Sequence, residues 1–314
     1  MSSAASSQPS RSGKTAVYLS LVLAVALVIG VVLGAKVVFD RAAKQPVVMS
    51  ELPAPLADSR ECADFIAGLP EELVGHDRAE IVEPVPAGAA AWTSSSVERV
   101  TLRCGVDLPF QYTDYAPTET IEGVEWLRIT DATPGSTLSS WYTVDREQVV
   151  AVTADEESLG RAGNPVADLA ENVSALPAAE HEPYPAPLSQ LAAAENTGDR
   201  CVALMAALPE TIAEDYGRID VAEPRTAAWT APGLEPVVLR CGVAPPENYR
   251  PGLQLNQVND IVWFEDTTLA NGTTSSTWFA LGRDIDIAVS VPQATGNAAV
   301  VELGEIIAAE TDTQ

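Results

Sequence analysis

Histidine is almost absent from this chain, which has only His76 and His181 among its 314 residues. Nucleophilic catalysis of the Ser-His-Asp or Cys-His kind needs a histidine base, and histidine-based zinc sites need imidazole ligands. The two histidines also lack counterparts in the internal repeat described below. We therefore expect no catalytic residue of this kind, no bound metal and no cofactor.

Lysine is also scarce and is confined to the N-terminal end. All three lysines (Lys14, Lys36 and Lys44) lie in the first 44 residues, which carry a net charge of +4, and the rest of the chain carries −30 with arginine as its only cation. A body with this charge repels phosphate backbones and anionic head groups, which excludes nucleic-acid binding. Because 46% of residues are hydrophobic and only 20% are charged, disorder throughout the chain is excluded as well.

One long run without charge extends from Ala16 to Ala35. It makes about 30 Å of helix, which matches the hydrocarbon core of a bilayer. A signal peptide usually has an apolar region of about 7–15 residues followed by a small-residue cleavage site, whereas Lys36 follows here. We expect an uncleaved, single-pass helix in the cell membrane at 16–35, a cytoplasmic tail at 1–15 and a stalk at 36–52.

The chain beyond the stalk contains an internal repeat. Leu102–Val106 (LRCGV) recurs identically as Leu239–Val243, and the same offset aligns Trp126 with Trp263. Every cysteine and every tryptophan has a partner in the other copy. We infer a tandem duplication, with repeat domain 1 at 53–176, an extended proline-rich linker at 177–184 and repeat domain 2 at 185–311.

The four cysteines divide evenly between the copies. No CxxC motif or neighbouring histidine suggests a metal or redox site, so the spacing favours the disulfides Cys62–Cys104 and Cys201–Cys241. Each would close a loop of about 40 residues and contribute about 4 kcal/mol. Disulfides form in an oxidising compartment, so we expect the N-terminus in the cytoplasm and both domains outside it.

Each copy predicts the same order of elements. An amphipathic helix begins at the first cysteine, strand-like segments follow (97–104, 124–130, 138–144 and 148–153 in the first copy), and a last helix is expected at 165–175 and 298–309. This order indicates an α+β fold. The expected architecture is two homologous antiparallel-sheet-plus-helix domains in tandem after the transmembrane helix.

The recurring tryptophans and arginines are the candidate binding residues. Tryptophan rings can stack on sugars, although core packing is their commoner role. The arginines can recognise an anionic ligand, although salt bridges to carboxylates are more common in so acidic a chain. The candidates are Trp92, Arg103, Trp126, Trp141 and Arg146 in the first copy and Trp229, Arg240, Trp263, Trp278 and Arg283 in the second.

Recurring carboxylates offer an enzymatic alternative, because two acids can hydrolyse glycosidic bonds without histidine. On a helix, however, such acids usually form a solvated face. The recurring pairs are Glu71/Glu210, Glu83/Glu223, Asp168/Glu302 and Glu171/Glu305.

The combination of Cys62, Leu69-Pro70, Ala91-Trp92, Leu102–Val106 and Pro109, with a later tryptophan and arginine, resembles a known family, the actinobacterial secreted or membrane-anchored domain of unknown function 3515. The resemblance covers nearly all of 53–311, in two copies where one is usual. The second copy is closer to the pattern, because Gly282-Arg283 replaces Asp145-Arg146 of the first. The resemblance implies an actinobacterial cell envelope and carries no activity.

These observations favour a membrane-anchored, non-enzymatic binding or interaction module of the cell envelope. Its expected partners are the membrane, through the N-terminal helix, and an envelope protein or wall glycan. The alternatives are an envelope hydrolase or modifying enzyme that uses the repeated carboxylates, and a structural spacer. The sequence leaves the oligomeric state open.

Overall fold

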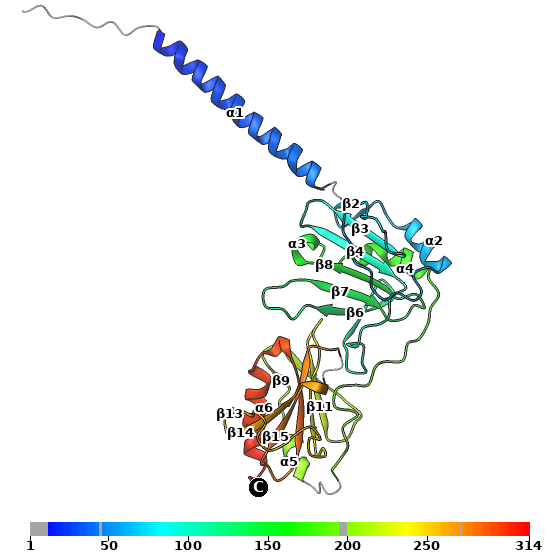
Figure 1. The fold of residues 1–314 in the computed structure, drawn as a ribbon, viewed down its shortest axis with the longest axis vertical. Helices are drawn as coiled ribbons and strands as arrows, with labels where there is room; N and C mark the ends of the chain where they lie inside the picture. The colour runs from blue at the N-terminus through cyan, green and yellow to red at the C-terminus, as the bar shows by residue number, and fades with distance from the viewer. Residues whose placement is uncertain (1–11, 44–45, 195–199, 270–271) are drawn as a thin grey trace, which may run out of the picture.

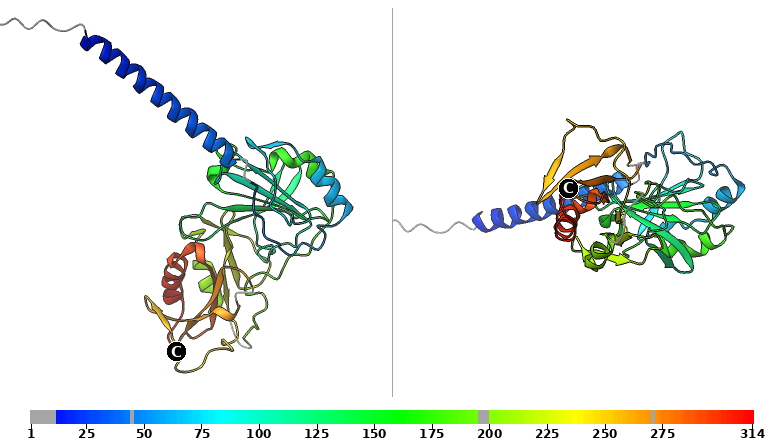
Figure 2. Two further views of the ribbon diagram at one scale, coloured as in Figure 1. Left: turned by 45° about the horizontal axis from the view of Figure 1, so that its top comes forward. Right: turned by 90° about the horizontal axis from the view of Figure 1, so that it is seen from below.

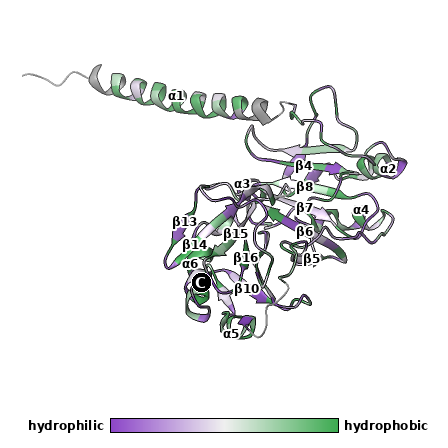
Figure 3. Ribbon diagram, turned by 60° about the horizontal axis from the view of Figure 1, so that its bottom comes forward, coloured by the Kyte–Doolittle hydropathy of each residue, from purple (hydrophilic) through white to green (hydrophobic). Residues whose placement is uncertain are grey.

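The computed structural model describes residues 12–43, 46–194, 200–269 and 272–314. The first eleven residues of the expected tail lie outside this range. Helix α1 (Ser12–Ala43) projects from the body of the protein (Figures 1 and 2). It contains a 23-residue apolar stretch, Ala16–Val38, of which nothing is buried, and Figure 3 shows its hydrophobic character. By length and composition, α1 is the one helix among the described residues that can cross a membrane.

Two eight-stranded antiparallel sheets follow, and their strand orders are identical. The first sheet has the order β1-β2-β3-β4-β8-β7-β6-β5, and the second has the order β9-β10-β11-β12-β16-β15-β14-β13. The register repeats as well, because Leu102 lies opposite Val152 in one sheet and Leu239 lies opposite Val289 in the other. The duplication read from the sequence is therefore also a duplication of topology.

The strands of the first sheet are β1 (Glu72–Leu73), β2 (His76–Arg78), β3 (Ala89–Thr93), β4 (Arg99–Cys104), β5 (Thr118–Ile121), β6 (Val124–Thr130), β7 (Ser139–Thr143) and β8 (Val150–Ala154). Those of the second are β9 (Thr211–Ile212), β10 (Tyr216–Ile219), β11 (Thr226–Thr230), β12 (Val237–Cys241), β13 (Asn256–Val258), β14 (Ile261–Asp266), β15 (Ser275–Leu281) and β16 (Ile287–Pro292).

Helices cover one face of each sheet. They are α2 (Arg60–Gly68) and α4 (Ala170–Ser174) in domain 1, and α5 (Arg200–Ala207) and α6 (Ala298–Glu310) in domain 2. The last helix of domain 1 is shorter than expected, because its first turn, Ala167–Leu169, is a 3-10 helix. A short helix α3 (Glu156–Leu159), capped by the Asp155 side chain, occurs in domain 1 only, and 3-10 turns at Thr267–Leu269 and Gln293–Thr295 occur in domain 2. The α+β class is confirmed.

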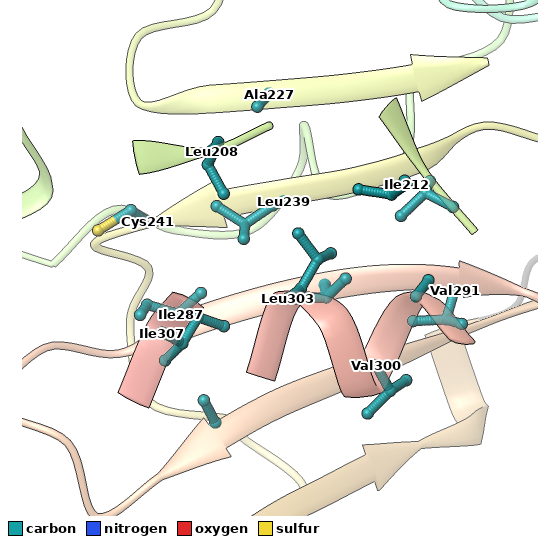
Figure 4. Close-up of a cluster of buried hydrophobic side chains, with 14 of the residues drawn as sticks. Leu208, Ile212, Ala227, Leu239, Cys241, Ile287, Val291, Val300, Leu303 and Ile307 are labelled. Atoms are coloured by element: carbon teal, nitrogen blue, oxygen red, sulfur yellow. The ribbon is translucent and has the colours of Figure 1, made fainter. Parts of the chain in front are cut away.

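The main core of each domain lies between its helices and its sheet. In domain 2 it joins Leu303 and Ile307 of α6 to Leu239 and Ile287 of the sheet, as Figure 4 shows. Both expected disulfides are present, Cys62–Cys104 and Cys201–Cys241, and each ties the first helix of its domain to a central strand. They fix the start of each copy to the centre of its sheet.

A second apolar cluster covers the opposite face of the domain 2 sheet. Val238 and Ala288 belong to it, whereas their neighbours along the strands, Leu239 and Val289, belong to the helix-side core. The cluster is closed by Ala186 and Leu188, which follow the linker. The sheet of domain 2 is therefore buried on both faces.

The stalk and the linker both form hydrogen bonds to domain 1. The Val47 amide donates to the Glu80 carbonyl (2.7 Å), and Val47 is buried. In the linker, the Tyr184 amide donates to the Tyr112 carbonyl (2.8 Å), and the Ala179 amide donates to the Asp145 carbonyl (3.1 Å). Both segments therefore pair with backbone groups of domain 1.

Candidate functional site

The predicted tryptophans form the cores of the domains. Five of them are less than 2% exposed: Trp92, Trp126, Trp141, Trp229 and Trp263. The sixth, Trp278, is half-buried and packs edge-on against Trp263, with ring centroids 6.3 Å apart. These five indole rings pack within the protein, so they provide no stacking platform for sugars.

Two tryptophans at equivalent positions, Trp92 and Trp229, also form the same hydrogen bond in each copy. The indole N–H of Trp92 donates to the Pro70 carbonyl, and that of Trp229 donates to the Pro209 carbonyl, both at 2.9 Å. The guanidinium of Arg78 lies over the Trp92 ring at 4.9 Å. The tryptophan thus ties the Leu-Pro end of the first helix to the sheet in each copy.

The recurring arginines Arg103 and Arg240 hold the segment that leads into their own domain. Arg103 donates to the Ser50 carbonyl, and Arg240 donates to the carbonyls of Leu188 (2.7 Å) and Leu191 (2.8 Å). Burial lowers the pKa of Arg103. These arginines bind backbone carbonyls, and neither forms an ion pair among the residues that the structure describes.

Arg146 and Arg283 hold the segment that leaves each domain. Both are buried, and their guanidinium groups donate to carbonyls at the end of the last helix, Val173 at 3.1 Å and Ala308 at 3.1 Å. A cation at a helix C-terminus is also favoured by the helix dipole. Within the part of the chain that the structure describes, Arg146 is the one predicted arginine that forms the expected salt bridge, with its neighbour Asp145 at 2.9 Å.

Several of the recurring carboxylates are bonded within the protein, and they lie on different parts of the two domains. Glu83 is exposed in the loop between β2 and β3, whereas Glu223 of domain 2 accepts a hydrogen bond from the Tyr115 hydroxyl. On α6, Glu302 accepts from the Ala213 amide (3.1 Å) and Glu305 accepts from Asn259 (3.4 Å). Within the described ranges, no three His, Cys, Asp or Glu side chains gather in a way that could hold a metal ion.

Domain 1 contacts domain 2 through the loop between β4 and β5. Tyr115 of this loop is buried in the second apolar cluster of domain 2. Burial is the main cause that raises the pKa of Tyr115, and the hydrogen bond to Glu223 is the second. The phenol therefore keeps its proton and donates it to the Glu223 carboxylate in a hydrogen bond. Gln111 of the same loop donates to Glu235 (3.0 Å).

A further contact between the domains involves backbone groups. The Thr130 amide at the end of β6 donates to the Gly233 carbonyl at 2.7 Å. Gly233 has φ +75°, and a Cβ at this position would lie 2.5 Å from Thr130 Oγ1. Glycine is therefore required both for the turn and for the close approach of the two domains.

A cavity of about 560 Å³ lies between the domains. Its volume is typical of sites for small molecules. Phe110 and Thr113 of domain 1, residues 184–188 and 190–191 of the linker region, and strands β15 and β16 of domain 2 line it. Among the described residues, no charged side chain lines the cavity, although the protein around it is strongly acidic.

The cavity has an apolar wall and a hydroxyl floor. Phe110 and Tyr184 pack against each other on the wall, with centroids 4.9 Å apart, and Leu188 continues it. The floor carries Thr277 of β15 and Ser290 of β16, which lie opposite each other in the sheet. The arrangement can bind a ligand that is apolar on one side and forms neutral hydrogen bonds on the other.

Leu188 adopts the left-handed backbone conformation, with φ +64°. This conformation is costly for a leucine and persists when surrounding contacts enforce it. Arg240 supplies such a contact by donating to the Leu188 carbonyl. The candidate arginine therefore shapes the cavity wall through the backbone without lining the cavity.

Sequence reasoning did not identify the residues of this cavity. Phe110 of the cavity and Tyr115 of the interdomain contact correspond to Glu247 and Gly252 in the second copy, so the repeat does not mark them. The feature of the sequence that could have identified them is that these aromatic side chains occur in one copy and not in the other. Such residues are candidates for contacts between copies, because contacts within each copy repeat.

The protein comparisons give a family and nothing more specific. No curated protein and no solved structure matches the chain. The model of a family described as "Protein of unknown function (DUF3515)" matches twice, at residues 21–181 and 177–314. The two matches correspond to the two domains with their helices, sheets and disulfides. The chain belongs to the DUF3515 family, as a tandem duplication of its domain.

Proposed function

We propose that this protein is a membrane-anchored, extracytoplasmic binding protein of an actinobacterial cell envelope, and that its binding site is the cavity between the two repeats. The N-terminus lies in the cytoplasm and α1 spans the membrane. The apolar helix and the two disulfides support this orientation. The cavity, lined by residues of both domains and of the linker, is the observation that carries the proposal.

Several features favour binding over catalysis. The cavity is lined by apolar and hydroxyl side chains, and the recurring carboxylates lie outside its lining. Its size suits a small molecule or the end of a chain, such as a unit of a wall glycan, better than a folded envelope protein. The site is formed by two different parts of two similar domains, which gives the duplication a function that a single copy lacks.

Photocrosslinking in intact cells tests the proposal. The full chain carries p-benzoylphenylalanine at position 110, where Phe110 lines the cavity and is 52% exposed, or at position 202 as a control, where Val202 is 65% exposed on α5. We expect a reproducible small-molecule adduct at position 110 that is absent at position 202 and is lost when Thr277→Phe fills the cavity. Equal labelling at both positions, or none at either, would contradict a binding site and favour the structural spacer.

A further inference from the structure

We propose that the cavity takes an uncharged amphiphile, whose neutral hydroxyl-bearing head group binds Thr277 and Ser290 and whose apolar chain packs on the wall formed by Phe110, Tyr184 and Leu188. This inference rests on the proposed function and names the ligand class of the same site.

The two residues of the floor are buried, and their hydroxyls have no hydrogen-bond partner among the described residues. Thr277 is 5% exposed and Ser290 is 3% exposed, and both line the cavity. Neither side chain forms a hydrogen bond within the described part of the chain, although most buried hydroxyls in proteins do. Buried hydroxyls that face an open cavity are groups that a ligand can satisfy.

The first repeat provides an internal comparison. Ser140 and Thr153 occupy the equivalent positions, lie opposite each other in the same register, and bond to each other at 2.7 Å. Both residues are half-buried, and neither is among the described residues that line the interdomain cavity. The same pair of hydroxyls is therefore mutually satisfied in one copy and open in the other, and the open pair is the one on the cavity floor.

The absence of charge in the lining selects against ionic ligands. An ion without a counter-charge in an apolar cavity loses its hydration and gains no compensating pair. The carboxylate of Glu235, which bonds to the lining residue Ser275, already accepts from the Ser275 hydroxyl (2.6 Å), the Thr274 amide (2.9 Å) and the Gln111 amide (3.0 Å). It is therefore occupied by the protein and does not attract a cation into the cavity.

Fluorine NMR on the full chain in nanodiscs tests the ligand class. A trifluoromethylphenylalanine at position 110 reports on occupation of the cavity independently of any partitioning of the probe into the bilayer. The probes are 1-O-hexylglycerol, which is neutral, hexanoate and hexyltrimethylammonium, which share the chain and carry opposite charges, and glycerol, which is the head group alone. We expect a saturable shift with hexylglycerol, at least tenfold weaker binding of both ions, and no shift with glycerol.

Matched variants test the role of the hydroxyls. Thr277→Val with Ser290→Ala keeps the shape of the floor and removes two hydrogen bonds, so hexylglycerol should bind roughly tenfold more weakly or worse. Ser140→Ala with Thr153→Val makes the same change in the first repeat and should leave binding unchanged. An unchanged melting temperature of the first variant shows that the loss is not due to unfolding.

The outcomes separate this inference from the proposed function. Equal binding of an ion, or wild-type binding by the Thr277→Val, Ser290→Ala variant, overturns the ligand class while the cavity remains a binding site. A lack of saturable shift with every probe overturns the neutral amphiphile as well, and the photocrosslinking at position 110 then decides separately whether the cavity binds anything.

Discussion

Gly233→Ala should weaken the contact between the two domains in addition to straining the backbone. At φ +75° an alanine costs about 1–2 kcal/mol relative to glycine. The new Cβ would also lie 3.4 Å from Arg128 Cγ and 2.5 Å from Thr130 Oγ1, and the second distance is a steric clash. The two domains must move apart to remove this clash, which lengthens the hydrogen bond between the Thr130 amide and the Gly233 carbonyl. Loss of this hydrogen bond costs about 1 kcal/mol. The expected total is about 2–3 kcal/mol.

Gly163→Ala is the matched control. Gly163 has φ +74°, and a Cβ there would meet no atom within 4 Å, so this variant reports the backbone strain alone. We expect the free energy of unfolding, measured with urea on the full chain in detergent, to fall by about 1 kcal/mol more for Gly233→Ala than for Gly163→Ala. Native-state hydrogen exchange at the Thr130 amide should accelerate about fivefold or more in Gly233→Ala only. Equal destabilisation by the two variants, with unchanged exchange at Thr130, would refute the idea that this glycine permits the approach of the domains.

Three further predictions test the other parts of the structure. Trp92→Phe should lower the free energy of unfolding by about 1 kcal/mol more than Trp126→Phe, because both rings are buried but only the Trp92 indole N–H has a partner, and equal losses in chemical denaturation would contradict this. Replacing Cys62 and Cys104 together by alanine should cost about 4 kcal/mol, given the 42-residue separation, and a loss below about 1 kcal/mol would argue against the disulfide as a main constraint on the unfolded chain. Burial raises the pKa of Asp286, so the wild-type protein loses stability as the pH rises from the usual carboxyl range through that raised pKa. The variant Asp286→Asn should therefore melt at a higher temperature than the wild type at pH 7, and this difference should disappear at low pH. A difference in melting temperature that does not change with pH would contradict this explanation.

Features that repeat were predictable from the residues alone. The cysteine pairs, the recurrence of the tryptophans and strands β7 and β8 follow from spacing and alternation, which depend on residues near in sequence or on the comparison of two copies. The arginines were identified as important, but their partners were not. Arg240 binds carbonyls about fifty positions away in the chain, and backbone carbonyls leave no trace in composition.

The docking of the stalk and linker could not be read from the sequence either. A proline-rich segment such as 177–184 is extended whether it is free or packed against a surface. Docking depends on where the backbone groups of domain 1 lie, and that is known only after the sheet has formed. The same holds for Tyr115, whose burial requires an apolar cluster on the far face of the other domain.

The sequence by itself therefore determined the duplication, the α+β class of each copy, the two disulfides and one apolar helix of membrane-spanning length. These properties arise from local periodicity, from residue counts and from side chains that each copy places in its own core. Only the tertiary structure decided that equivalent residues of the two copies have different surroundings. Phe110 of one domain and the docked linker line a cavity over the sheet of the other, and Thr277 and Ser290 face this cavity, whereas Ser140 and Thr153 satisfy each other. Identical positions thus acquire different environments, because burial of a sheet face depends on segments far away in the chain.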